Sequence, residues 1–210
     1  MQTIPSEKFH RKFPQAELIY IPNFFSVEEA NALFQKLLED TPWLHDNITV
    51  FGKTYPQPRL TALFGKNSKP YSYSGITMNS LPYSKTLQAI DKKIEQEIAH
   101  KFTTVLMNLY RNGNDSNGWH ADNEKELGKN PVIASVSFGA ERFFHFKHRL
   151  NKALNYKLLL GHGSLLVMKG EMQHFWLHQL PKTKQTLGER INLTFRSINW
   201  KAEVPQPRLF

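Results

Sequence analysis

Two histidines and an aspartate have the residue types and the spacing of a metal site. One residue separates His120 from Asp122, and His178 follows later in the chain. Side chains two positions apart in an extended strand project to the same face, so His120 and Asp122 can bind one ion together. Two imidazoles and one carboxylate leave three metal positions open, as in non-haem Fe(II) oxygenases. His174 competes with His178 for the role of second histidine.

The strand that follows His178 favours an iron site. In residues 190–196 polar and apolar side chains alternate, and the polar face carries Arg190, Asn192, Thr194 and Arg196. An arginine on the inner face of a sheet needs an anion, so a dicarboxylate bound beside the metal would explain both arginines. They lie roughly 20 Å apart along an ideal strand, which suits the two ends of one elongated anion. Arg196 would then lie nearer the metal, with Asp122 as its partner.

Zinc is the alternative metal, because two histidines and one carboxylate also build hydrolytic zinc sites. Such sites need a general base beside the bound water, and they do not need two inward arginines. The sequence contains the arginines and has no H-E-x-x-H helix motif, so we expect Fe(II).

Length and composition bound the class of protein. The chain has 210 residues, enough for one domain with a sizeable core. A formal net charge of +9 suits a polyanionic partner such as nucleic acid. The lack of cysteine excludes disulfides and thiolate metal sites. No apolar run reaches the roughly 18 residues that span a bilayer, and no signal-peptide pattern is present. We therefore expect a soluble intracellular protein, either cytoplasmic or in the nucleoid or nucleus, with no membrane partner.

The elements that must position these residues fall into an N-terminal and a C-terminal half. Residues 1–16 are polar and are expected to be a flexible arm, and residues 17–21 read as a strand. Ser26 and Glu29 form a capping-box pattern before a helix over residues 27–39. A second helix is expected after Ser84, with a buried stripe formed by Leu87, Ile90, Ile94 and Ile98.

Residues 48–80 are irregular and rich in Pro, Gly, Tyr and Lys, as in a long functional loop. After them the pattern changes to short strands separated by turn residues, expected at 103–111, 132–138, 142–147, 156–160, 164–168, 174–178 and 190–198. This spacing predicts a mainly β sandwich or jelly roll with flanking helices. We expect one integrated domain that comprises a flexible arm (1–16), N-terminal helices with a nucleotide-recognition lid (17–101), a catalytic core (102–200) and a tail (201–210).

The combined pattern of His120-Ala121-Asp122, His178 and residues 190–196 resembles the signature of the AlkB family of Fe(II)/2-oxoglutarate-dependent nucleic-acid demethylases. The resemblance extends to residues 108–110, 134–139 and 162–166, and it covers roughly residues 18 to 199. It implies a double-stranded β-helix that uses Fe(II), 2-oxoglutarate and O2. The metal ligands that it implies are His120, Asp122 and His178. The cosubstrate-binding residues that it implies are Asn108, Tyr110, Arg190, Thr194 and Arg196.

The same resemblance implies repair of 1-methyladenine and 3-methylcytosine in DNA, with release of formaldehyde and succinate. A base must leave the helical stack to reach such a pocket. Residues 50–53 resemble the intercalating finger of the duplex-DNA-acting branch. Tyr73 takes the position that stacks on the flipped base opposite His120, where relatives usually carry Phe, and Tyr71 would form a hydrogen bond nearby. The candidate substrate-binding residues are Phe51, Gly52, Lys53, Arg59, Tyr71, Ser72, Tyr73, Asn123 and Glu124.

Several alternatives remain open at this point. Asn123 follows the metal aspartate where the duplex branch typically carries an acid that reads the exocyclic amine, and Glu124 could supply that charge. The basic stretches 147–149 and 182–184 are candidate phosphate contacts. We expect the protein to be a monomer and its partner to be double-stranded DNA. The same chemistry on RNA or protein is an alternative, and so is a non-catalytic basic module that binds nucleic acid.

Overall fold

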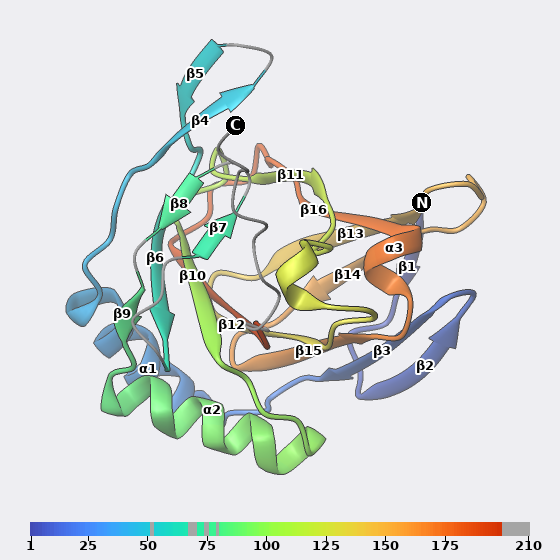
Figure 1. The fold of residues 1–210 in the computed structure, drawn as a ribbon. Coiled ribbons are helices and arrows are strands. Elements are labelled where there is room, and N and C mark those ends of the chain that lie inside the picture. Colours follow the sequence, from blue (N-terminus) through green and yellow to red (C-terminus); the bar gives the residue numbers. More distant parts are fainter. Residues whose placement is uncertain (51–52, 67–70, 74–75, 79, 199–210) are drawn as a thin grey trace, which may run out of the picture.

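Two β-sheets form the body of the protein in the computed structural model, which describes residues 1–50, 53–66, 71–73, 76–78 and 80–198 (Figure 1). The larger sheet has eight strands in the order β2 (Phe9–Phe13), β3 (Ala16–Ile21), β15 (Ser164–Lys169), β12 (Ile133–Gly139), β17 (Arg190–Arg196), β10 (Thr104–Tyr110), β6 (Leu60–Gly65) and β9 (Leu81–Pro82). The smaller sheet has five strands in the order β1 (Gln2–Ile4), β14 (Asn155–Leu160), β13 (Arg142–His148), β16 (Trp176–Leu180) and β11 (Asn117–His120).

The C-terminal strands cross repeatedly between the two sheets, as in a jelly roll, and the consecutive strands β13 and β14 pair within the smaller sheet. Strands β10, β12, β15 and β17 lie in the larger sheet, and β11, β13, β14 and β16 lie in the smaller one. Hydrophobic side chains fill the space between the two sheets, among them Leu18, Leu106, Phe146 and Trp176. The expected mainly β fold with flanking helices is therefore confirmed.

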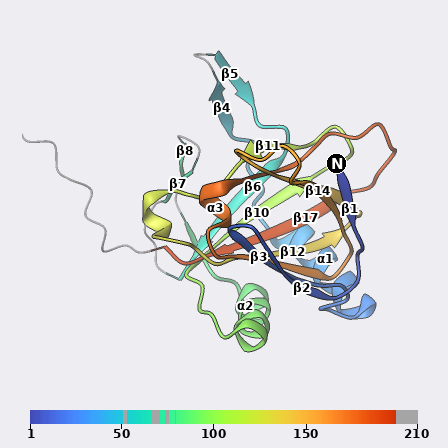
Figure 2. The same cartoon turned by 90° about the vertical axis from the view of Figure 1, so that its right-hand side faces the viewer.

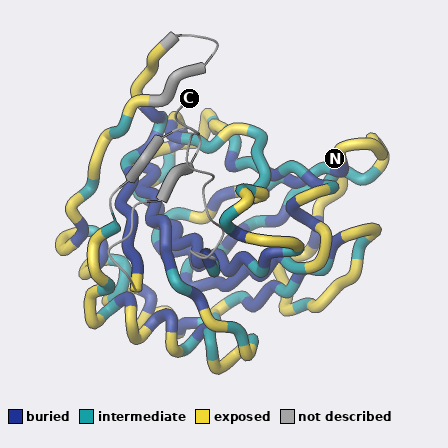
Figure 3. The backbone as a smooth tube through the Cα atoms, in the orientation of Figure 1, coloured by how far each residue is buried: buried dark blue, intermediate teal, exposed yellow. Residues whose placement is uncertain are grey.

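Two helices cover the other face of the larger sheet. Helix α1 (Val27–Asp40) begins with the expected capping box, because Glu29 N–H donates to Ser26 Oγ at 3.2 Å and Ser26 N–H donates to Glu29 Oε2 at 3.0 Å. Helix α2 (Lys85–Ile98) begins after Ser84, as expected. Buried apolar side chains of both helices pack against strands of the larger sheet, which leaves the outer helix surfaces exposed (Figure 3).

Three local predictions were wrong. The segment expected as a flexible arm forms β1, which pairs in parallel with β14, and β2, which pairs with β3. The segment expected as an irregular loop contributes β6, a buried strand next to β10. The strand expected at residues 174–178 is divided, because helix α3 (Met172–Phe175) precedes β16. Strands β1 and β6 pair with strands that are distant in sequence, and a local pattern does not contain those partners. Asp122 also lies two residues beyond the end of β11.

The remaining strands form two hairpins on one side of the body. Strands β4 (Asn47–Val50) and β5 (Lys53–Pro56) pair with each other and project beyond the two sheets, which is visible in both views (Figures 1 and 2). Strands β7 (Tyr71–Tyr73) and β8 (Ile76–Met78) also pair with each other. A one-turn 3-10 helix, η1, covers Lys125–Leu127. Within the described ranges, none of the helices combines the length and apolarity that a bilayer crossing requires.

Candidate metal and cosubstrate site

A polar pocket opens between the two sheets and receives side chains from both. Its walls comprise Leu106, Asn108, Tyr110, Asn117, His120, Asp122, Ser135, Phe144, Leu160, Met168, His178, Gln179, Leu180, Arg190, Asn192, Thr194 and Arg196. The smaller sheet supplies the two histidines, and strand β17 of the larger sheet supplies both arginines. The structure thus gathers in one pocket the residues that the sequence suggested for the metal and the cosubstrate.

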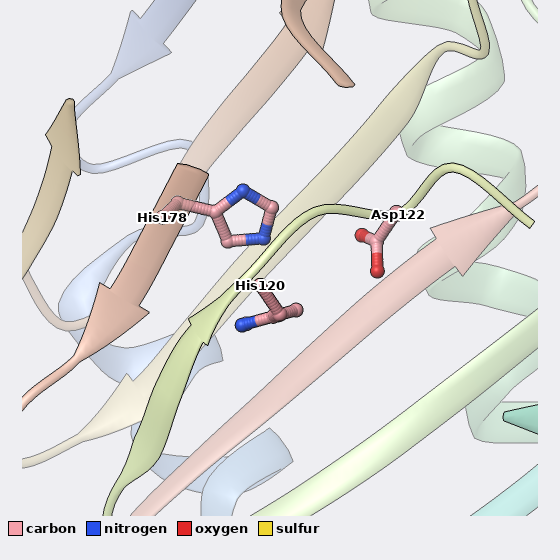
Figure 4. A group of neighbouring side chains, drawn as sticks. All are labelled: His120, Asp122 and His178. Atoms are coloured by element: carbon pink, nitrogen blue, oxygen red, sulfur yellow. The ribbon is translucent and has the colours of Figure 1, made fainter. Parts of the chain in front are cut away.

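The three candidate metal ligands converge on a common space (Figure 4). One ligand atom from each of His120, Asp122 and His178 lies within 4.8 Å of the other two. His120 and His178 are directly opposite each other on the paired strands β11 and β16. The competing histidine, His174, is exposed on α3 and is not part of this group. The arrangement can hold one metal ion through two imidazoles and one carboxylate.

Hydrogen bonding and burial prepare both imidazoles to bind a metal. His120 Nδ1 lies 2.7 Å from the carbonyl oxygen of Gly118, which favours the proton on Nδ1 and leaves Nε2 as an acceptor. Burial lowers the pKa of His120 below its usual range. Burial also lowers the pKa of His178 to about 3. Both rings are therefore neutral near pH 7, and neutral imidazole is the form that coordinates metals.

Asp122 is held in its ionised form by Arg196. Burial alone would raise its pKa, but the charge of the Arg196 guanidinium opposes burial, and the pKa is lowered. Arg196 Nη2 donates to Asp122 Oδ1 at 2.8 Å, which is the pairing that the sequence suggested. The backbone N–H of Asp122 donates to Oε1 of the buried Gln173 at 2.9 Å, so helix α3 fixes the position of this loop. A fixed carboxylate beside two neutral imidazoles fits Fe(II).

At the other end of β17, Arg190 is buried without an acidic partner. Its Nη2 donates to Ser137 Oγ at 2.9 Å, and its guanidinium lies 5.3 Å from the centre of the Tyr110 ring. Its Nε has no hydrogen-bond partner, and among the described residues no carboxylate forms an ion pair with it. Burial lowers the pKa of Arg190 to about 10, so the side chain remains charged near pH 7. A buried cation of this kind favours an anionic ligand such as a carboxylate.

Polar side chains connect the two arginines along the strand. Asn192 Nδ2 donates to Ser135 Oγ at 2.7 Å, and the hydroxyl of Thr194 donates to Asn192 Oδ1 at 3.0 Å. The sequence placed Asn192 on the polar face of this strand, but neither Asn192 nor the two serines that contact this row, Ser135 and Ser137, were among the cosubstrate-binding candidates. Their signal was present, because both serines alternate with apolar residues in β12, as Asn192 does in β17.

The sequence suggested that Arg59 contacts either phosphate or the cavity rim. Arg59 is buried, whereas a phosphate contact would require it on the surface. Its Nε donates to Asn108 Oδ1 at 2.8 Å, and its Nη1 donates to the carbonyl oxygen of Ser116 at 3.3 Å. Asn108 lines the pocket with Tyr110 from the same strand. Arg59 therefore orients Asn108 and the loop before β11.

The two residues after the metal aspartate differ in exposure. Asn123 is exposed to solvent, whereas Glu124 is half-buried and its Oε2 has no hydrogen-bond partner in the part of the chain that the structure describes. Burial, together with the charge of Asp122, raises the pKa of Glu124. Glu124 thus has the unpaired polar atom that a bound base could contact.

The remaining substrate candidates belong to the two hairpins. Phe51 and Gly52 lie outside the described residues, between the paired Val50 and Lys53. Tyr71, Ser72 and Tyr73 form β7, but their side-chain positions are also outside the described part of the structure, as is that of Lys53.

Comparisons with known proteins agree with this site. The family model for the 2OG-Fe(II) oxygenase superfamily matches residues 17–196. The Bos taurus protein named alpha-ketoglutarate-dependent dioxygenase alkB homolog 3 is 41% identical over 196 residues, which cover 89% of this chain and 66% of that protein. The Homo sapiens protein named DNA oxidative demethylase ALKBH2 is 36% identical over 184 residues, which cover 83% of this chain and 70% of that protein.

Among solved structures, that of OsALKBH1 matches with a TM-score of 0.63 at 17% identity, covering 89% of this chain and 100% of that one. This likeness concerns the fold alone. The chain spans 66% of the length of the alkB homolog 3 relative, just under two thirds.

Proposed function

The chain belongs to the AlkB family within the 2OG-Fe(II) oxygenase superfamily, and from that premise we propose that it is a dioxygenase that removes N-linked methyl groups from nucleic-acid bases. The family's cofactors are Fe(II) and 2-oxoglutarate, with O2 as the oxidant, and the donor set of the pocket fits them. The single observation that carries the proposal is the convergence of the three ligands and the unpaired Arg190 on one pocket.

The residues of the pocket divide into two groups by role. His120, Asp122 and His178 would hold the metal through Nε2 of His120, a carboxylate oxygen and a nitrogen of His178. Arg190 would bind the distal carboxylate of 2-oxoglutarate, since a charged fork in a buried site binds carboxylates strongly. The other polar residues of the pocket would bind the rest of the cosubstrate, namely Asn108, Tyr110, Thr194 and Arg196.

When bound, Fe(II), 2-oxoglutarate and O2 would together supply the oxidation that hydroxylates an N-methyl carbon, with 2-oxoglutarate converted to succinate and CO2, after which the hydroxymethyl group would leave as formaldehyde. The protein's own contribution is to exclude water and to hold the methyl group beside the ligands. Phe144, Leu160 and Met168 form apolar parts of the pocket wall that serve this purpose.

We assign recognition of the base to Glu124 and to residues 71–73. Glu124 is the acid that would accept a hydrogen bond from the exocyclic amine of the methylated base, because its Oε2 is buried and unpaired. The exposed Asn123 would lie farther from the base. Tyr73 would stack on the base opposite His120, and Tyr71 would form a hydrogen bond beside it. Together with Ser72, these residues would belong to a nucleotide-recognition lid.

The substrate that we propose is double-stranded DNA carrying 1-methyladenine or 3-methylcytosine. The β4–β5 hairpin projects from the body, so a residue at its turn could enter a duplex (Figure 2). Phe51 would fill the gap left by an extruded base, with Gly52 allowing close approach and Lys53 meeting phosphate. A DNA substrate would require a nucleoid or nuclear location. RNA is the second candidate substrate, because the pocket would also accept a methylated base from a single strand.

The test measures binding before catalysis. Fe(II) and 2-oxoglutarate are bound to the protein without oxygen, air is then admitted, and a 1-methyladenine oligonucleotide is examined by mass spectrometry. Conversion to adenine with stoichiometric succinate supports the proposal, and parallel duplex, single-stranded DNA and RNA substrates rank the alternatives.

Two histidine variants sharpen this test. His178→Ala should abolish the reaction, whereas the matched variant His174→Ala should retain it, because His174 is exposed and lies outside the ligand group. Nucleic-acid binding without succinate under any condition would favour the non-catalytic module and refute the proposed activity.

The role of the β4–β5 hairpin can be tested with one variant and a matched control variant. Phe51→Ala should slow repair of duplex DNA more than repair of single-stranded DNA, whereas Tyr55→Ala, an exposed position on β5, should affect both equally. If Phe51→Ala changed the rates on duplex and single-stranded DNA by the same factor relative to the wild type, the role of Phe51 as a wedge would be refuted.

A further inference from the structure

The smaller sheet has a solvated outer face that the proposed reaction does not use. Along β13 and β16 buried residues alternate with partly exposed ones, so the buried side chains face the larger sheet and the others face outward. The outward set includes Phe143, His145 and Lys147 on β13, with Lys157 on β14. Trp119 also belongs to it, because the adjacent His120 points into the pocket and successive side chains in a strand alternate.

Charge is segregated between this sheet and the helical layer. None of the five strands β1, β11, β13, β14 and β16 contains an aspartate or a glutamate, whereas their outward positions carry Lys147 and Lys157. Helix α1, on the far side of the larger sheet, carries Glu28, Glu29, Glu39 and Asp40 against the single cation Lys36. A polyanion would therefore be attracted to the smaller sheet and repelled from α1.

Each outward lysine lies over an aromatic ring. Lys147 Nζ is 4.2 Å from the centre of the Trp119 ring, and Lys157 Nζ is 4.6 Å from the centre of the Phe143 ring. Lys147 reaches Trp119 across β16, since β13 and β11 flank that strand. Neighbouring strands lie about 4.8 Å apart, so the two lysine–ring pairs extend over roughly 14 Å from β14 to β11. The two pairs are also offset along β13 by the four residues from Phe143 to Lys147, about 13 Å, so cations and aromatic faces alternate in a diagonal row over the outer face.

We propose that this row, formed by Trp119, Phe143, Lys147 and Lys157, is a second nucleic-acid contact that binds single-stranded nucleic acid outside the pocket, so that the protein would hold an unpaired strand as well as the duplex proposed above. The proposal rests on the proposed function for the identity of the polymer. Proteins that bind single strands combine cations along the backbone path with aromatic rings on which bases stack. Here the lysines would move from the rings to phosphates, and the rings would accept bases.

Nucleic acid suits this row better than an acidic protein does. An acidic protein segment would bind through the cations alone, and a tryptophan and a phenylalanine beside them would add little to its affinity. Bases gain from both, because every base has a face that stacks on an aromatic ring. Phe143 is 37% exposed, which is enough ring surface for such a contact.

The experiment measures binding of an unmodified, fluorescently labelled single-stranded oligonucleotide by anisotropy at several salt concentrations. The test variant is Lys147→Gln/Lys157→Gln, and the matched control is Lys85→Gln/Lys92→Gln, which removes the same charge from exposed positions on α2. The test variant should bind about tenfold more weakly, and its salt slope should be about 1.4 smaller, since each lost phosphate contact lowers the slope by about 0.7. Lys147→Arg/Lys157→Arg should restore binding.

A tryptophan variant separates nucleic acid from other polyanions. Trp119→Leu should weaken binding of the oligonucleotide about fivefold or more and leave binding of poly-glutamate unchanged. Circular dichroism verifies that each variant is folded. Equal affinities and salt slopes for the test and control lysine variants would overturn the proposal, and so would equal losses for both polymers in Trp119→Leu.

This binding assay needs neither iron nor a methylated base. If the protein demethylates nothing but the lysine variants behave as expected, the proposed function fails and the second contact stands. If demethylation occurs and the lysine variants match the control, the second contact fails alone.

Discussion

The two ends of strand β17 contain the same residue type in opposite electrostatic situations. Arg196 and Arg190 are both buried and both line the pocket. Arg196 is paired with Asp122 at 2.8 Å, so its charge is compensated within the protein. Arg190 contacts a serine hydroxyl and an aromatic ring, with no carboxylate opposite it among the described residues. Burial of an arginine is therefore not by itself evidence of a ligand site. Burial of an arginine that has no carboxylate partner is such evidence.

The largest expected effect is at the uncompensated end. Arg190→Gln should weaken 2-oxoglutarate binding by about 100-fold or more, because a buried carboxylate would lose its charged partner. Metal affinity should remain close to that of the wild type. Anaerobic calorimetry with Fe(II) bound measures both quantities. Arg190→Lys keeps the charge and loses the planar fork, so its affinity for 2-oxoglutarate should lie between those of the wild type and Arg190→Gln. An unchanged affinity for 2-oxoglutarate in Arg190→Gln would remove the basis of the comparison.

At Arg196, whose charge is compensated by Asp122, a substitution should weaken binding of the metal more than binding of 2-oxoglutarate. Arg196→Gln leaves the buried Asp122 without its ion pair, which would raise the pKa of that carboxyl and weaken metal binding by about 10- to 100-fold. The same calorimetry with metal as titrant provides the measurement. If Arg196→Gln and Arg190→Gln lost the same amounts of metal affinity and of 2-oxoglutarate affinity, the two ends of β17 would not be functionally distinct.

Acidic pH should destabilise the metal-free protein through His178. Burial lowers the pKa of His178 to about 3, while an imidazole in an unfolded chain titrates near 6.5. Between these values the unfolded state binds a proton that the folded state excludes. The free energy of unfolding of the metal-free protein should therefore fall as the pH drops below about 6.5, by up to about 1.4 kcal/mol per pH unit from this residue. Urea titrations in chelator above and below that pH measure the change, and His178→Gln should depend less on pH than the wild type.

The smallest effect concerns the hydroxyl beside Arg190. Ser137→Ala removes the hydrogen bond at 2.9 Å and should weaken 2-oxoglutarate binding about fivefold, which corresponds to about 1 kcal/mol. Ser135→Ala is the matched control, because Ser135 contacts Asn192 in the middle of the strand. A larger loss in the control than in Ser137→Ala would place the anion elsewhere along β17.

The polar face of β17 could be predicted from the sequence because its signal is local. Side chains two apart in β17 must share a face, so Arg190, Thr194 and Arg196 could be grouped without coordinates. The partners on other strands could not be grouped in this way. Gln173 holds the loop of Asp122 from helix α3, and no local pattern connects two residues that are 51 positions apart.

The fold was predictable to a similar degree. Helices α1 and α2 were identified by caps and apolar stripes that lie within the elements themselves. Strands β1 and β2 are polar and pair at the sheet edges, so nothing in residues 1–16 distinguishes them from a loose arm. Strand β6 is continuously buried and lacks the alternation that identifies a half-buried strand.

The direct pairing of His120 with His178 across β11 and β16 has a consequence for assembly of the chain. A slip of one residue between these strands would turn one imidazole to the opposite side of the sheet. An ion that requires both rings would then stabilise the native register and no other. Metal binding would thus discriminate against misaligned intermediates during folding, so the protein's iron supply would influence its yield as well as its turnover.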